Sequence, residues 1–224
     1  MEIAKLSFID HNAIAVLRQL FVACPIFVAM DSSKSYIFEM LVTNIWPILN
    51  KNIHCLRVPS TFFRSFRRFV PSLLKDCPSL RIFNACRGGF FAEFPADDNA
   101  NAVEGQAVAK WLFSPRPDDV PKAFKCTLHL VLEKWSPKIE PLKTAFASAS
   151  SPSNFIVSIW VRPTSFDDSV VPFALTNEFT QEQLALKRTS ISNCFLLVRH
   201  PITRDESKCF LTQFLAQMIS SRSE

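Results

Sequence analysis

The sequence predicts an α/β fold in which strand-helix units repeat along the chain and an antiparallel β meander follows them. Short apolar runs typical of buried strands lie near residues 6, 28, 56 and 81, a spacing of about 20 to 30 residues. Amphipathic segments separate these runs. Such a period is typical of stacked leucine-rich-type repeats. Because the full leucine-rich consensus is not met, a layered domain with a mostly parallel sheet is the alternative.

The first region, residues 1–162, is expected to supply the repeated units. Ser60 follows Pro59 and is the expected N-cap of an amphipathic helix, and Pro47 is expected to kink or end the helix that contains it. The expected strands are 3–9, 26–30, 53–58, 80–85, 122–132 and 155–161, and the expected helices are 13–21, 36–49, 60–75, 106–113 and 139–149.

The second region, residues 163–224, changes character after Pro163. Three short runs separated by polar turns, 170–177, 183–189 and 194–199, predict an antiparallel meander. An amphipathic helix over 205–220 is expected to close the chain. With 224 residues and 48% apolar composition the chain is long enough to bury one core, so we expect the two regions to pack as one domain.

Composition excludes several classes of protein. The chain has only three glycines and neither GxGxxG nor GxxxxGK[ST], which argues against nucleotide-dependent enzymes of those types. Its seven cysteines are scattered among apolar neighbours, without CxxC, so we expect buried, reduced thiols. Neither a metal nor another cofactor is expected. No uninterrupted apolar run approaches the length of a membrane span, and the expected compartment is the cytoplasm or the nucleus.

Positive charge is concentrated in residues 51–87. This segment has eight Lys or Arg residues and one acid, a net charge of +7, so the rest of the chain carries −2 of the total of +5. Three interpretations stay open: a solvated helix face, a patch that binds an acidic segment of a protein partner, and a nucleic-acid site. We rank nucleic acid last, because exposed aromatic side chains for base stacking are not evident.

The candidate partner-binding surface combines this basic segment with the loop 88–101, which we expect to be exposed. Loops held by a rigid sheet are common binding positions. Asp97 and Asp98 lie in this loop and are interpreted as turn residues. The predicted binding residues are Arg57, Arg64, Arg67, Arg68, Lys75, Arg81, Arg87, Phe90, Asp97 and Asp98.

No local signature of catalysis occurs. The four histidines are far apart, and no GxSxG marks a nucleophilic serine. A hydrolase site assembled in space is the weakest of the alternatives, and we predict a chain that is not an enzyme.

Sequence blocks spread over residues 74–208 resemble the region that follows the F-box in a nematode-type family of F-box-domain-containing proteins. The opening LSFIDHNAIAVLRQLF is also similar to the start of that region. The blocks are LKDCPSLRIFNA, FFAEFPADDNA, GQAVAKWLFSPR, NFIVSIWVRP, PFALTNEFTQEQLALKR and FLLVRHPITRDESK. The resemblance implies a substrate receptor whose F-box docks on a cullin–RING ubiquitin ligase, while the following domain captures the target protein.

The docking element of that family is expected to be missing here. An F-box begins near a Leu-Pro pair, whereas this chain has no proline before Pro25. The predicted partner is therefore a protein target of unknown identity, and components of the ligase are retained as alternative partners.

Overall fold

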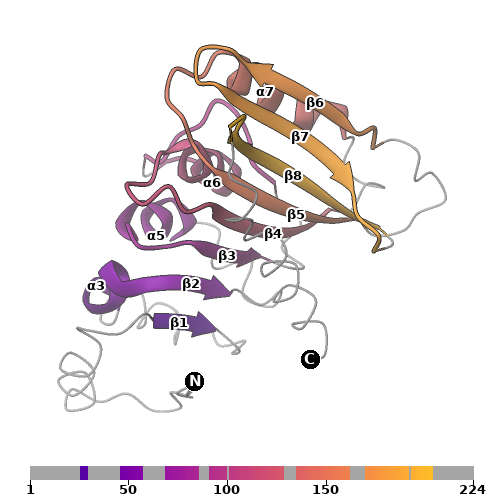
Figure 1. Cartoon of the computed structure of the whole chain (residues 1–224). Helices are drawn as coiled ribbons and strands as arrows, with labels where there is room; N and C mark the ends of the chain where they lie inside the picture. Colours follow the sequence, from indigo (N-terminus) through magenta and orange to yellow (C-terminus); the bar gives the residue numbers. More distant parts are fainter. Residues whose placement is uncertain are drawn as a thin grey trace.

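A computed structural model of the chain describes residues 26–29, 46–57, 69–85, 91–99, 101–128, 135–161, 170–191 and 193–203 (Figure 1). The expected strand 3–9, the expected helices 13–21 and 205–220, and most of the expected helices 36–49 and 60–75 lie outside these residues.

The described residues form one eight-stranded sheet in the order β1-β2-β3-β4-β5-β8-β7-β6. The strands are β1 (Ile26–Ala29), β2 (Ile53–Arg57), β3 (Ile82–Ala85), β4 (Lys122–Leu128), β5 (Phe155–Val161), β6 (Phe173–Asn177), β7 (Glu182–Arg188) and β8 (Cys194–Pro201).

The first five strands are parallel and follow one another in the sheet in chain order. Parallel neighbours need a crossover connection, and the described crossover helices are α5 (Val70–Asp76), α6 (Glu104–Phe113) and α7 (Ser136–Ala147). A short helix α3 (Trp46–Leu49) and a 3-10 turn η2 (Asn50–Asn52) precede β2. The prediction of a mixed α/β fold with a largely parallel sheet is confirmed for these residues.

The meander joins this sheet through its last strand. β8 pairs antiparallel with β5, with Val157 opposite Leu197, and β7 and β6 extend the sheet beyond it. The predicted antiparallel meander is thus confirmed. In Figure 1 the parallel strands and the meander form one continuous twisted layer. The predicted boundary between residues 162 and 163 therefore falls between β5 and β6, within one sheet.

The helices pack on the sheet face that carries the main core. Alternate residues of the central strands point to this face, among them Phe124, Val157 and Leu197. They meet apolar residues of the helices such as Leu73, Leu112 and Phe146. A smaller cluster of Ala123, Ile156, Leu196 and Val198 lies among the alternating residues of the opposite face. Residues of both faces are buried in β4 and β5, which explains the nearly continuous apolar sequence of β5.

Several element boundaries agree closely with the sequence pattern. The strand 155–161 is confirmed at both ends, and the helix expected over 106–113 begins two residues earlier, at Glu104. The helix expected over 139–149 occupies Ser136–Ala147, with a proline, Pro137, in its first turn, where the missing N–H costs nothing. Pro47 does not end its helix at that point, since α3 continues to Leu49 and into η2.

The expectation of an exposed loop is wrong for part of residues 91–99. Phe91 and Ala92 are buried in the main core, and the Phe91 ring lies 6.0 Å from that of Trp135. The segment is irregular because it pairs with α6 rather than with a strand: the N–H of Glu93 donates to the carbonyl of Gly105 at 2.9 Å. The rest of the segment is accessible: Glu93, Pro95 and Asn99 are exposed, and Asp97 is partly exposed.

Within the described residues, no helix combines the length and apolar character that crossing a bilayer requires.

Gly105 marks the closest approach of α6 to this segment. A Cβ at this position would lie 2.6 Å from Cγ of Glu93 and 2.8 Å from the backbone oxygen of Phe91. We expect Gly105→Ala to lower the free energy of unfolding by about 1 to 2 kcal/mol, since overpacking outweighs the gain of about 1 kcal/mol in helix propensity. Urea denaturation measures the change.

The control for this prediction is an exposed position of the same helix. Because Lys110 is exposed, comparing Lys110→Ala with Lys110→Gly measures the difference in helix propensity alone, and the alanine variant should be the more stable by about 1 kcal/mol. If Gly105→Ala stabilises the protein by a similar amount, α6 is not held at the predicted distance from residues 91–93.

Candidate functional site

An open groove of about 830 Å³ lies between the segment at Phe94, α6 and α7. Its surface is mainly apolar. The lining residues are Phe94, Pro95, Ala96, Phe113, Glu140, Pro141, Thr144, Ala145, Ser148, Ala149, Ser150 and Ser151. Because the groove is open rather than enclosed, it suits a segment that lies on the surface better than a small molecule that a closed pocket would bury.

One wall of the groove is the segment Phe94–Ala96, which α6 fixes in place. The Gln106 side chain donates from Nε2 to the carbonyl of Pro95 at 3.1 Å, and its Oε1 accepts from the N–H of Val103. The Phe94 ring meets the edge of Phe113 at 5.2 Å, and Phe113 contacts Phe155 of β5 at 5.5 Å. The aromatic wall therefore rests on the sheet.

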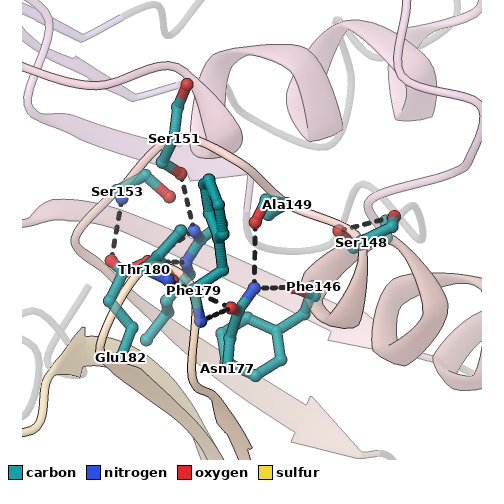
Figure 2. Close-up of polar contacts among 11 residues, drawn as sticks. Phe146, Ser148, Ala149, Ser151, Ser153, Asn177, Phe179, Thr180 and Glu182 are labelled. Carbon is teal, nitrogen blue, oxygen red and sulfur yellow. Dashed lines mark hydrogen bonds and ion pairs between the residues drawn. The ribbon is translucent and has the colours of Figure 1, made fainter.

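The opposite wall is the exposed side of α7 and the turn that follows it. Asn177, at the end of β6, donates from Nδ2 to the carbonyls of Phe146 at 2.7 Å and Ala149 at 3.0 Å (Figure 2). Its Oδ1 accepts from the N–H groups of Phe179 and Thr180. One buried amide thus caps the carboxyl end of α7 and ties it to the β6–β7 turn, so both are held in a fixed position.

A buried ion pair lies directly behind the groove. Arg199 of β8 is 0% exposed and donates from Nη2 to Oε2 of Glu182 at 2.6 Å. The same nitrogen donates to the carbonyl of Ser151 at 2.9 Å, and Oε1 of Glu182 accepts from the N–H of Ser153 at 2.8 Å. The guanidinium lies between the rings of Phe113 and Phe146, at 5.0 and 5.2 Å. The pair therefore positions both the aromatic wall and the turn 151–153.

Glu140 is the charged side chain of the groove lining. Its side chain is 62% exposed, and its carboxylate accepts from Lys143 at 2.8 Å. Lys143 itself points over the ring of Phe173, 4.5 Å from its centroid. Among the described residues, no lysine or arginine lines the groove.

A second buried cation, Lys122, lies at the start of β4. Its Nζ donates to the backbone carbonyls of Trp111 and Ser114 at the carboxyl end of α6, which a cation complements. Burial, and then the positive charge of Arg116, lower the pKa of Lys122 to about 7. Arg116 is itself anchored to Asp118 at 2.7 Å and to the carbonyl of Leu80.

The sequence-predicted binding residues are only partly within the described structure. Arg64, Arg67, Arg68, Arg87 and Phe90 lie outside it. Arg57 ends β2, at the carboxyl edge of the parallel strands. Lys75 in the last turn of α5 and Arg81 just before β3 precede that strand and lie towards the amino edge.

These three basic residues are thus not all gathered at one edge of the sheet, and none of them lines the groove. Whether they bind a partner stays a prediction.

The acidic pair of the prediction lies beside the groove wall. The N–H of Asp97 donates to the carbonyl of Gln106, and Oδ1 of Asp97 accepts from the N–H of Asn99 at 3.1 Å. This is the local turn hydrogen bond expected for Asp97. Asp98 is partly exposed next to it.

Sequence reasoning missed Glu182, Arg199 and the groove residues of α7. Arg199 stands at the end of an apolar strand and Glu182 at the start of the next strand along the sheet, five residues after Asn177. The available signal was an opposite-charge pair, with Arg199 in one predicted strand and Glu182 directly before the neighbouring predicted strand, 183–189. The register that places the two side chains diagonally on one face comes only from the fold.

The chemical groups of the described residues do not assemble into a metal site: among them, no three His, Cys, Asp or Glu side chains converge. Cys77, Cys126 and Cys194 are buried, reduced thiols, as expected, whereas Cys55 is reduced and half-buried. Burial raises the pKa of Cys55 to about 11, and burial together with Asp76 raises the pKa of Cys77. Both thiols are therefore protonated and weakly nucleophilic at neutral pH.

Comparison of the chain with protein-family models, with curated proteins and with solved structures gave no match.

The ion pair behind the groove has a measurable effect on stability. Arg199→Met leaves the Glu182 carboxylate buried without its cation, and we expect a loss of about 3 to 5 kcal/mol in the free energy of unfolding. The double variant Arg199→Met/Glu182→Gln removes the buried charge but keeps an acceptor for Ser153, so it should recover part of this loss. Chemical denaturation of the three proteins measures both effects. A loss below about 1 kcal/mol for Arg199→Met would contradict the buried pair.

Lys122 predicts a pH dependence of stability. Its pKa is about 7 in the fold against an ordinary value of 10.5. Between these values the unfolded chain binds the extra proton, so this residue makes stability rise with pH from about 7 to about 10.5 and contributes no slope below that window. Lys122→Met should remove this component. Urea denaturation at pH 7, 8 and 9 measures it.

The control is Lys187→Met, which removes an exposed lysine from β7. The difference in unfolding free energy between wild type and Lys187→Met should be nearly independent of pH. If the difference between wild type and Lys122→Met is equally flat, the Lys122 ammonium is as well stabilised in the fold as in water.

Proposed function

We propose that this chain is a non-enzymatic protein-interaction domain, comparable to the substrate-recognition region of F-box proteins, and that it binds a segment of its target in the groove beside α7. The resemblance to the region after the F-box motivates the class of protein. The observation that carries the proposal is the open, mainly apolar groove, whose walls are fixed by buried polar contacts. A preorganised apolar groove binds a peptide with a smaller ordering cost than a mobile surface does.

The order of the parallel strands supports this proposal. β1 to β5 are adjacent in the sheet in the order of the chain, and the crossover helices α5, α6 and α7 contribute to one core on one face. Leucine-rich-type repeats have the same succession of strand and helix, and such proteins present extended binding surfaces. On this proposal the chain is a repeat-like receptor of the cytoplasm or nucleus that needs no cofactor.

The position of the groove agrees with one part of the predicted binding surface. One wall of the groove, residues 94–96, belongs to the loop 88–101, which is part of the partner-binding surface predicted from the sequence. The other wall, α7, adds the residues that turn this loop into a concave site. Coupling to a ubiquitin ligase is a separate part of the proposal, because binding of a target segment in the groove does not require a ligase.

The test fills the groove without adding charge. Ala145 lines it, and Ala145→Gln adds bulk with a residue that favours helices, so target binding should be lost while the fold is retained. Ala147→Gln is the matched control, because Ala147 is exposed on the same helix and does not line the groove. The three proteins are affinity-purified from the native cells, and their partners are quantified by mass spectrometry.

A partner that is retained by wild type and Ala147→Gln but lost from Ala145→Gln supports the proposal. Equal recovery of all partners by the three proteins rejects the groove as the binding site. Recovery of the cullin complex with the same target would support ligase coupling, and its absence from a sample that contains the target would reject that part alone.

A further inference from the structure

We infer that the groove selects a segment of a partner protein in which apolar residues stand next to a lysine or arginine. This inference rests on the proposed function and specifies the chemistry of the bound segment. It differs from the preference expected from the basic stretch of the sequence, which would favour an acidic target.

Among the described residues, the one charged residue of the groove lining is an acid, Glu140. Its side chain projects from α7 and is 62% exposed, and Lys143 contacts one of its two carboxylate oxygens, Oε1, at 2.8 Å. Lys143 is also drawn towards the ring of Phe173. An ionised carboxylate has room for further donors, so Glu140 has capacity for a second cation. No described lysine or arginine lines the groove itself, so the positive charge that an incoming cation meets at Glu140 is that of Lys143 on Oε1.

The carboxyl end of α7 adds to this potential. The last turn of the helix borders the groove at Thr144, Ala145 and Ser148, and a helix terminus of this kind carries partial negative charge. Among the described residues, the carbonyls of Thr144 and Ala145 accept from the hydroxyl of Ser148, and the carbonyl of Thr144 also accepts from its N–H; these donors bring no net charge. A basic side chain beside Glu140 is therefore attracted by two groups on the same wall.

The apolar part of the segment has its own contacts. Phe94, Phe113 and Pro141 form a surface that an aliphatic or aromatic side chain covers. The stems of lysine and arginine are themselves apolar and are able to lie on such a surface while their charged ends reach Glu140. The groove thus matches alternating apolar and basic residues better than it matches either kind alone.

A second apolar contact lies beyond the end of the groove. Phe179 is 78% exposed at the β6–β7 turn, and its N–H is held by Asn177, whose amide also binds the groove residue Ala149. Ile202 is also exposed, and its N–H donates to the carbonyl of Gln181 in the same turn. Figure 2 shows this turn joined to the end of α7 by the Asn177 amide. A segment long enough to leave the groove at Ser151 would meet Phe179 next.

The experiment measures which peptides the folded chain selects. A displayed library of random 12-residue peptides is panned against the full chain, and synthetic fluorescein-labelled versions of the enriched peptides are titrated by anisotropy. Wild type should enrich peptides with lysine or arginine next to apolar residues. Exchanging each basic residue for glutamate should weaken binding by about ten-fold, because a favourable contact with Glu140 becomes a repulsive one.

Three variants connect this preference to the groove. Glu140→Lys should weaken the binding of the basic peptides by about five-fold and remove the preference for basic over uncharged peptides. Asp76→Lys, which makes the same charge change on exposed α5 away from the groove, should leave binding unchanged. Phe179→Ser removes the outlying apolar contact, so it should weaken the binding of those enriched peptides that extend beyond the groove by about five-fold without lowering the melting temperature of the protein.

The outcomes separate this inference from the proposed function. Enrichment of acidic or uncharged peptides, or of basic peptides that bind Glu140→Lys as well as wild type, overturns the charge preference and leaves a protein-interaction domain in place. No enriched peptide, together with an Ala145-dependent partner from cells, overturns recognition of a short segment in favour of a folded partner surface. No enriched peptide and no Ala145-dependent partner overturns both.

Discussion

The contact on which the groove depends most is the buried ion pair between Arg199 and Glu182. Two neighbouring strands of the meander supply it, yet its remaining hydrogen bonds go to residues 151 and 153, which lead into the parallel half of the sheet. Its guanidinium also separates two phenylalanine rings from different helices, Phe113 of α6 and Phe146 of α7. One pair of charges thus fixes the distance between the meander, both helices and the turn that ends the groove.

Much of the fold could be predicted from the sequence because its strands are short apolar runs with clear turns between them. The strand at Phe155–Val161 and the three strands of the meander follow directly from that pattern. The loop 88–101 shows where such reasoning ends. Its acids and glycines predict exposure, but Phe91 and Ala92 enter the core because backbone hydrogen bonds to α6 satisfy part of the polar groups of an irregular segment.

The groove was less accessible to sequence reasoning than the fold. Its lining comes from three segments that are separated by many residues, and its components, alanine, proline and serine, carry no chemical signature. The concentration of eight basic residues in 51–87 predicted a binding surface in that segment. The concave site formed elsewhere, because the segment 94–96, Phe113 of α6 and α7 together line it and Asn177 caps the carboxyl end of α7.

The position of β5 between a parallel and an antiparallel neighbour has a consequence for synthesis of the protein. β4 precedes β5 and is available as soon as β5 leaves the ribosome, whereas β8 follows it by about 40 residues, a delay of about 2 to 8 s at ordinary rates of translation. During this interval one edge of an apolar strand has no neighbour, and Glu182 of β7 is made before Arg199, its partner in β8. The nascent chain is therefore most open to chaperones and to aggregation while the meander is being made.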